Sequence, residues 1–134
     1  MKQKIKTALV SVSDKTDLSK VLRTLNKYNV KIISSGGTYK SIKKLGYACI
    51  EVSTYTGFKE MLDGRVKTLH PKIHAGILHD RSNKKHSKEM NKKKFPSLDL
   101  IIVNFYPFQR IVTNSKNDKE IIENIDIGGP TMVR

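Results

Sequence analysis

The first third of the chain alternates short apolar runs with polar turns and amphipathic stretches, and this order limits the possible folds more than any other feature. A β-prone run at 7–12 breaks into the polar stretch 13–17, and apolar residues then recur every three or four positions from Leu18 to Tyr28. A second run, 30–34, leads into Gly36-Gly37 and another amphipathic stretch. Strand, turn and helix therefore occur twice, which predicts an α/β fold with a mainly parallel sheet.

Two further apolar runs extend this pattern. Residues 48–52 predict a third strand, and residues 99–104 predict a fourth. The fourth run is so continuously apolar that we expect it in the middle of a covered sheet, with helices on both faces. Short helices are expected at 106–112 and 118–124. The 134 residues suffice for one compact domain, residues 1–134, and are too few for two ordinary ones.

Positive charge dominates the composition. The chain has 26 Lys and Arg against 12 Asp and Glu, a formal net charge of +14, which favours anionic partners such as phosphates or nucleic acids. Much of the excess lies in Lys84 to Lys94, where aromatic residues are absent until Phe95. A solvated helix face or loop therefore fits this segment better than a specific nucleic-acid site. Binding of nucleic acid through charge alone is the rival, and it predicts an affinity that falls steeply with salt.

Other classes of protein fit the sequence less well. No window approaches the roughly 18 apolar residues of a membrane span, and the lysine-bearing start lacks a secretory signal, so we expect a cytoplasmic protein without membrane contact. The single cysteine, Cys49, lies in an apolar stretch without a Cys or His at metal-ligand spacing, and we expect it to pack in the core.

Polar loops follow the first two predicted strands, at the sheet edge where α/β folds bind ligands. Hydroxyls, an ammonium and glycines at the start of a helix can hold a phosphate. Neither loop has P-loop or dinucleotide-binding spacing, and for either one alone a tight turn or a helix cap at Ser13 explains the residues as well. The candidate phosphate ligands are Ser11, Ser13, Lys15 and Thr16 in the first loop and Ser35, Gly36, Gly37 and Thr38 in the second.

A second candidate group lies in the segment 63–71. Arg65 can grip a phosphate or carboxylate through its two-pronged guanidinium, and Lys67 can stabilise a developing oxyanion. A solvated loop is an equally good reading of the composition alone. His70 and His74 are four residues apart, but Pro71 is expected to spoil the first helical turn and the HExxH glutamate is missing, so we predict no metal site.

Two more candidates stand near the C-terminal end of the chain. Tyr106 directly follows the fourth predicted strand, where a tyrosine either packs or transfers protons. Asp126 precedes a Gly-Gly-Pro sequence, where it either orients a lysine or substrate amine or caps the helix that Pro130 begins. The sequence leaves both alternatives open.

Several long strings are familiar in order and spacing: SVSDKT, SSGGT, YTGFKEMLDGRVKTLHPKIHAGIL, IIVNFYPF and ENIDIGGPTMVR. Together they span essentially the whole chain. The chain closely resembles the N-terminal domain of the bifunctional purine-synthesis proteins that join aminoimidazole carboxamide ribonucleotide (AICAR) transformylase to inosine monophosphate (IMP) cyclohydrolase. The resemblance implies a methylglyoxal-synthase-like fold, a three-layer α/β/α sandwich.

The resemblance also implies an activity and a site. Members of the family close the purine ring of formyl-AICAR to give IMP and water, without a cofactor, and they form homodimers. It implies catalytic roles for Lys67, Tyr106 and Asp126, with the eight residues of the two loops on the 5′-phosphate and Arg65 nearby. Substrate contacts are also expected from Thr68, Ile127 and Gly128.

Two consequences follow from where the resemblance stops. Family members continue past Arg134 with another active-site lysine and a transformylase domain, so we expect a C-terminally truncated domain with a partly built site and no transformylase activity. Turnover by this chain does not follow from the resemblance. The alternative is a non-catalytic nucleotide- or phosphate-binding regulatory module of the same fold, which would need neither Lys67 nor Tyr106. The acid-base motifs of methylglyoxal synthase itself are not recognisable here.

Overall fold

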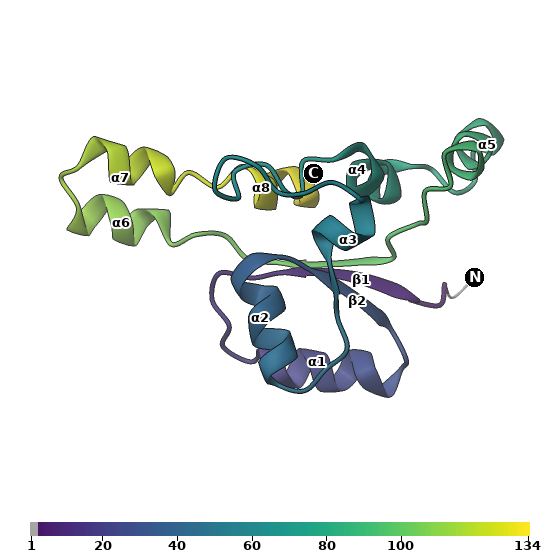
Figure 1. The fold of residues 1–134 in the computed structure, drawn as a ribbon, viewed down its shortest axis with the longest axis horizontal. Helices are drawn as coiled ribbons and strands as arrows, with labels where there is room; N and C mark the ends of the chain where they lie inside the picture. The colour runs from purple at the N-terminus through teal and green to yellow at the C-terminus, as the bar shows by residue number, and fades with distance from the viewer. Residues whose placement is uncertain (1–2) are drawn as a thin grey trace.

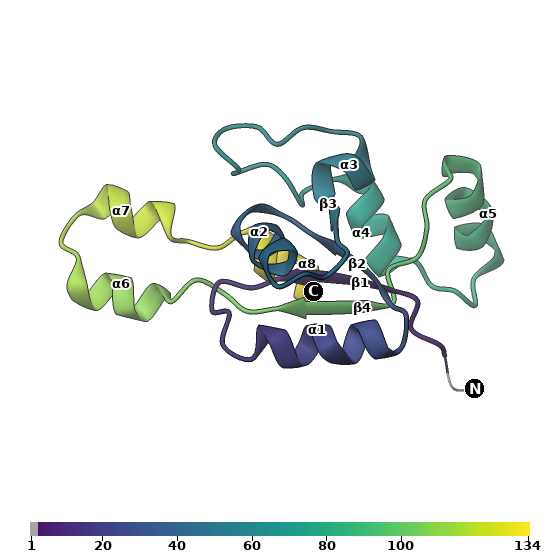
Figure 2. The same ribbon diagram turned by 60° about the horizontal axis from the view of Figure 1, so that its bottom comes forward.

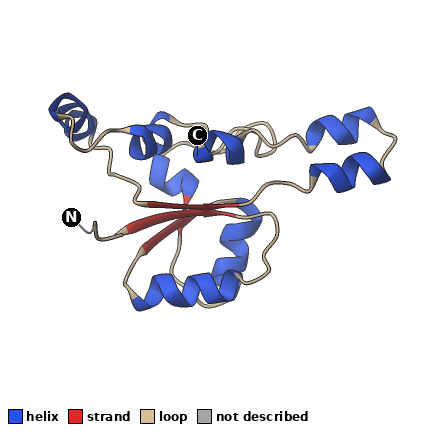
Figure 3. Cartoon of the chain, turned by 180° about the vertical axis from the view of Figure 1, so that it is seen from behind, coloured by secondary structure: helices blue, strands red, loops and turns tan. Residues whose placement is uncertain are grey.

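The computed structural model describes residues 3–134 as a three-layer arrangement around one parallel sheet. Its four strands lie in the order β3-β2-β1-β4, and each pair is parallel. In Figure 1, α1 and α2 cover one face of the sheet, and α3, α4 and α8 cover the other. Figure 3 shows the strands enclosed between these two helical layers. The predicted α/β/α sandwich with helices on both faces is therefore confirmed.

The elements follow the predicted order. The strands are β1 (Thr7–Ser11), β2 (Lys31–Ser34), β3 (Ile50–Glu51) and β4 (Leu100–Val103). The helices are α1 (Leu18–Lys27), α2 (Gly36–Lys44), α3 (Val52–Thr56), α4 (Pro71–Leu78), α5 (Lys84–Lys93), α6 (Phe108–Asn114), α7 (Asp118–Glu123) and α8 (Gly128–Val133). The third predicted strand is shorter than expected, because the chain turns into α3 at Val52.

Alternation along the strands divides the core into two clusters. Ala8 and Val10 of β1 point to the α1 and α2 side, where they pack with Leu22 and Ile42. Leu9 points to the opposite side and packs in the second cluster, which also holds Ile33 of β2, Val52 and Tyr55 of α3, Ile73 of α4 and Met132 of α8. A strand segment that is covered on both faces needs apolar side chains in succession, and the three buried central residues of β1, Ala8, Leu9 and Val10, meet this condition.

The expectation that the fourth strand lies mid-sheet is wrong. β4 pairs with β1 alone and forms one edge of the sheet that residues 3–134 build. Leu100 and Ile102 nevertheless pack against the first cluster, and Ile101 and Val103 pack against the second. The continuous apolar run therefore reflects cover on both faces of the strand, which does not require a neighbour on both edges.

The inference that Pro71 spoils the first helical turn is also wrong. Pro71 is the first residue of α4, where its missing N–H costs nothing and its fixed φ suits the helix. His70 is the N-cap, and its Nδ1 accepts a hydrogen bond from the Lys72 backbone N–H at 3.1 Å. The polar region after Val52 thus contains two helices that its composition concealed.

Two parts of the molecule project from the compact centre (Figures 1 and 2). The lysine-rich segment forms α5, of which Met90 is the buried residue, so the prediction of a solvated helix is confirmed. On the other side, α6 and α7 form a helical hairpin that buries none of its own residues. Across residues 3–134, the helices lack the combined length and hydropathy of a membrane-crossing segment.

Cys49 is half-buried and packs against the first cluster, as the apolar stretch around it predicts. Burial raises the pKa of its thiol to about 11, which keeps it in the unreactive thiol form at neutral pH.

Burial predicts unequal effects for two leucine truncations. Leu22 is fully buried, so Leu22→Ala should lower the free energy of unfolding by about 2–5 kcal/mol. Leu45 is 47% exposed, and Leu45→Ala should cost less than about 1 kcal/mol. Urea denaturation followed by circular dichroism measures both, and equal costs would contradict the assignment of the core.

Candidate functional site

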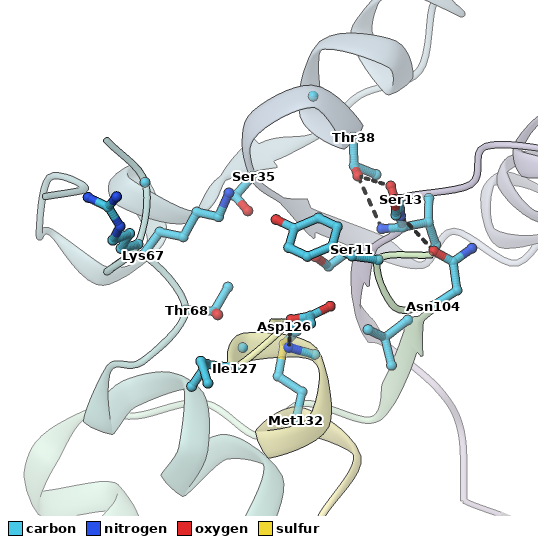
Figure 4. A pocket seen from close by; sticks show the side chains of 18 of the residues that line it. Ser11, Ser13, Ser35, Thr38, Lys67, Thr68, Asn104, Asp126, Ile127 and Met132 are labelled. Atoms are coloured by element: carbon cyan, nitrogen blue, oxygen red, sulfur yellow. Dashed lines mark hydrogen bonds between the residues drawn. The ribbon is translucent and has the colours of Figure 1, made fainter. Parts of the chain in front are cut away.

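A cavity of about 650 Å³ opens at the carboxyl edge of the sheet. The loops after β1 and β2, the segment 63–68, the chain after β4 and the start of α8 all contribute to its wall (Figure 4). Most of the residues predicted from the sequence line it: Ser11, Ser13, Lys15, Ser35, Gly37, Thr38, Arg65, Lys67, Thr68, Tyr106, Asp126, Ile127 and Gly128. Ser11 and Met132, which are 121 positions apart in the sequence, share this cavity because parallel strands place their carboxyl ends at the same edge of the sheet.

Thr16 and Gly36 are the two predicted residues that do not line the cavity. The Thr16 hydroxyl donates to Asp14 Oδ1 at 2.6 Å, and the Thr16 backbone N–H donates to the same oxygen at 2.8 Å. The hydrogen bonds from Thr16 lower the pKa of the Asp14 carboxyl. Thr16 therefore stabilises the first loop through Asp14 and does not line the cavity. Gly36 is the first residue of α2 and lies just behind the wall, beside Lys67.

The first loop differs from the phosphate-binding helix start that the sequence suggested. α1 begins at Leu18, beyond the loop, and its N-cap position is Asp17, so Ser13 does not cap this helix. The backbone N–H groups of Ser13 and Asp14 both donate to Asn104 Oδ1, at 2.6 and 3.2 Å. The loop therefore faces the cavity with the side chains of Ser13 and Lys15.

The start of α2 differs from the first loop, because its backbone N–H groups are free to bind a ligand. The first backbone N–H groups of a helix have no partner within it, and the Ser35 side chain makes no capping hydrogen bond here. A Cβ atom added to Gly37 would lie 3.8 Å from Lys15 Nζ, and one added to Gly36 would lie 3.3 Å from Lys67 Nζ. Free N–H groups and two ammonium groups thus converge where the glycines let a ligand approach.

Lys67 and Arg65 are presented by a tight hairpin. Met61 and Val66 form an isolated antiparallel bridge, and between them Leu62, Asp63 and Gly64 all have positive φ. A left-handed conformation costs a leucine of the order of 1 kcal/mol, and such strain concentrates at functional sites. The hairpin turns the chain sharply enough to place Lys67 Nζ 3.7 Å from a Cβ position on Gly64 and beside α2.

Arg65 reaches across the cavity to α7. Its NH2 and Nε lie 2.5 and 3.2 Å from the two carboxylate oxygens of Glu123. The hydrogen bonds of the pair raise the pKa of Arg65 and lower that of Glu123. Both side chains are well exposed, so water screens the attraction between them and either can exchange its partner readily. The guanidinium predicted to approach a phosphate thus pairs with a carboxylate in this structure.

The opposite wall is formed by the start of α8 against Thr68. Thr68 is buried, and a Cβ on Gly128 would lie only 2.8 Å from its Oγ1. Asp126 Oδ1 accepts a hydrogen bond from the Gly129 N–H at 2.9 Å, so the capping alternative for Asp126 has a geometric basis. Its carboxylate still lines the cavity together with Ile127 (Figure 4). The Asp126 carboxylate can therefore hydrogen-bond to the start of α8 and face a ligand at the same time.

Tyr106 lies in the chain segment between β4 and α6 and is 43% exposed, so its ring is not a core packing group. Its side chain lines the cavity that Lys67 and Asp126 also line. A phenol, an ammonium and a carboxylate thus share one water-accessible space, which suits proton transfer and stabilisation of negative charge.

Several wall residues were not among the predicted site residues, Asn104 and Glu123 foremost. Asn104 begins the loop 104–108, which the sequence places at the carboxyl edge of the sheet after an apolar strand, although only Tyr106 of that loop was predicted to act in the site. Glu123 carries no such signal, because its pairing with Arg65 spans 58 positions. The group of hydrophobic wall residues Ile122, Ile125 and Met132 likewise becomes visible only in three dimensions.

No group of three or more His, Cys, Asp or Glu within residues 3–134 is arranged to hold a metal ion. His70 is engaged as a helix cap, and His74 lies within α4.

The contact between α8 and Thr68 makes a specific stability prediction. In Gly128→Ala the new methyl must displace the buried Thr68 hydroxyl, which should cost about 1–3 kcal/mol of unfolding free energy. Adding Thr68→Ala removes Oγ1 and should recover most of that loss relative to Thr68→Ala alone. Thermal unfolding of the four proteins completes the cycle, and simple additivity would show that the two residues do not touch.

The fold and site can be compared with known proteins. The family profile of the MGS-like domain matches residues 17–131. The bifunctional purine biosynthesis protein PurH of Acetivibrio thermocellus is 51% identical over 131 residues, and PurH of Clostridium acetobutylicum is 52% identical over 130 residues. Each alignment covers 97% of this chain and 26% of the relative, so the chain spans about a quarter of the length of these curated relatives.

Among solved structures, the crystal structure of ForH superposes with a TM-score of 0.80 at 26% identity, covering 96% of this chain and 65% of that chain. The resemblance to the bifunctional purine-synthesis proteins and the methylglyoxal-synthase-like fold are thereby confirmed. The chain belongs to the MGS-like domain family.

Proposed function

We propose that this chain carries the IMP cyclohydrolase site of a purine-biosynthesis protein, which closes formyl-AICAR to IMP with loss of water. One observation carries the proposal: both phosphate-type loops and the trio Lys67, Tyr106 and Asp126 line a single cavity. The similarity to PurH proteins supports the same pathway. A ribonucleotide has a phosphate at one end and a reactive base at the other, and the cavity wall holds candidate groups for both.

The phosphate end is formed by the start of α2 and the side chains of the first loop. Backbone N–H groups at Gly36 and Gly37, the hydroxyls of Ser11, Ser13 and Ser35, and Lys15 Nζ can surround a 5′-phosphate. Arg65 can exchange the exposed Glu123 carboxylate for a ligand oxygen at little cost.

The reaction forms one C–N bond and releases one water. The carboxamide nitrogen of formyl-AICAR attacks the formyl carbon, and negative charge develops on the formyl oxygen. That oxygen takes one proton from the carboxamide nitrogen and one from the formamide nitrogen and leaves as water. An amide is a poor nucleophile, so the site must hold the two groups in a near-attack pose and stabilise the oxyanion. The reaction has no redox step, and the proposal includes no metal or cofactor.

In this proposal each member of the trio has one role. Lys67 donates to the developing oxyanion, Tyr106 moves a proton, and Asp126 positions and balances the charge of the reacting amide. Backbone N–H groups near Ile127 and Gly128 add donors, and Thr68 supports that wall. Lys67 Nζ rests beside the first residues of α2, so the same ammonium also strengthens the phosphate end.

We further propose a homodimer in the cytoplasm, as the family resemblance implies. Specific nucleic-acid binding is not part of the proposed function, because the dense lysine cluster on α5 lies outside the cavity wall and has no aromatic residues between its lysines.

Calorimetric titration with IMP, inorganic phosphate and an unrelated nucleotide, at low and moderate salt, tests the proposed site. We expect IMP to bind more tightly than either competitor at both salt concentrations, because the cavity addresses base and phosphate together. Equal binding of every anion, with an affinity that collapses in salt, would show that the net charge alone attracts them.

Replacement of Lys67 separates the catalytic role from a binding role. In a complete domain, Lys67→Met should lower the rate of IMP formation from formyl-AICAR by at least about a hundredfold, and it should also weaken IMP binding because Lys67 Nζ lies beside α2. Lys40→Met, on the exposed surface of α2, is the matched control. Near-normal turnover would remove Lys67 from the mechanism. Selective IMP binding without turnover by the unsubstituted complete domain would instead favour a nucleotide-binding module.

A further inference from the structure

We propose that Asn104 and Thr38 are positioning residues, which clamp the first loop from two sides so that its side chains, and not its backbone, face the phosphate. The inference rests on the proposed function, since it specifies how that site holds the phosphate end of its ligand. It concerns contacts within the protein and assigns neither side chain a direct contact with the ligand.

Asn104 holds the loop from the end of β4. Its Oδ1 accepts hydrogen bonds from the backbone N–H groups of Ser13 at 2.6 Å and Asp14 at 3.2 Å. Its Nδ2 donates a hydrogen bond to the Asp14 carbonyl oxygen at 2.8 Å. One primary amide thus matches two donors and one acceptor of the loop. An aspartate lacks the donor and an alanine lacks all three contacts, so the pattern is specific to an amide.

Thr38 holds the loop from the side of α2. Its hydroxyl donates to the Val12 carbonyl oxygen at 2.9 Å and accepts the Val12 backbone N–H at 3.1 Å. Thr38 is 5% exposed, and both hydrogen-bonding roles of the hydroxyl are in use. The hydroxyl predicted to bind phosphate is therefore committed to the loop, while the backbone N–H of Thr38 remains at the start of α2. Figure 4 shows both clamps, with Ser13 between them.

The clamp decides which groups meet a ligand. Four backbone N–H groups of the loop donate hydrogen bonds to side chains of the protein: those of Val12, Ser13, Asp14 and Thr16. Lys15 Nζ lies within 3.2 Å of the Val12 and Ser13 carbonyl oxygens, so the shape of the clamped backbone also fixes this ammonium close to Gly37. These four groups are therefore not free to bind a phosphate, whereas the first N–H groups of α2 are, and the Lys15 ammonium lies beside them.

Two variants test the clamp. Asn104→Ala removes the link to β4, and Thr38→Val removes the hydroxyl while it keeps side-chain shape and the backbone N–H. The probes are IMP and ribose 5-phosphate, each titrated into the ¹⁵N-labelled protein and followed through the amide resonances of Lys15 and Gly37. Loss of two or three hydrogen bonds that preorganise the loop should weaken binding of both probes at least about tenfold.

Matched controls make the same chemical change away from the cavity. Asn83 Oδ1 accepts two backbone N–H groups at the start of α5, and the Thr24 hydroxyl donates to the Lys20 carbonyl oxygen in α1. Asn83→Ala and Thr24→Val should leave binding of both probes within about twofold, and thermal unfolding of the test and control variants measures how much stability each change costs. This difference separates positioning from a general effect on folding.

The outcomes distinguish the clamp from the proposed function. If Asn104→Ala and Thr38→Val bind ribose 5-phosphate within twofold of the unsubstituted protein, or if that protein shows no ribose 5-phosphate binding at this loop, the clamp is overturned. If IMP binds no more tightly than ribose 5-phosphate while the variants lose affinity for both, the clamp stands and the proposed function fails. Faster solvent exchange of the Ser13 amide in Asn104→Ala, with weakened binding, supports the clamp directly.

Discussion

Parallel pairing of β1 with both β2 and β4 is the constraint on which the rest of the structure depends. It brings three strand ends to one edge, and the chain must leave each end through a loop on that edge. The same pairing buries both faces of β1, which requires apolar side chains above and below and so calls for two helical layers. Site and core are therefore two results of one arrangement of backbone hydrogen bonds.

The two phosphate-type loops solve the same electrostatic problem with different groups. The second loop leads directly into α2, whose free N–H groups are the anion-binding groups of the proposed site. The first loop uses up its backbone donors internally and offers side chains instead. One helix start and one ammonium-bearing loop can enclose a phosphate from opposite sides, whereas two flexible loops would first have to be ordered at an entropic cost.

The rest of the cavity wall contains one exposed contact and one buried contact, which differ in how easily a ligand could displace them. Arg65 and Glu123 join the hairpin to α7 through an exposed ion pair, while Thr68 and the start of α8 meet in a tight buried contact. An exposed pair yields to a competing anion at low cost, and a buried contact resists displacement. The cavity thus combines a fixed wall on the side of Asp126 with an exchangeable one on the side of Arg65.

The sequence by itself determined the fold class, most helices and many of the residues that line the cavity, because apolar periodicity and glycine-containing loops are local signals that can be read without a structure. Tertiary structure decided what depends on contacts between distant residues. It put β4 at the edge, since an apolar run reports covered faces and not neighbours, and it made Pro71 a helix start. It also gave Thr38 and Asn104 their partners, because a hydroxyl or an amide looks the same in a sequence whether it binds a ligand or holds a loop.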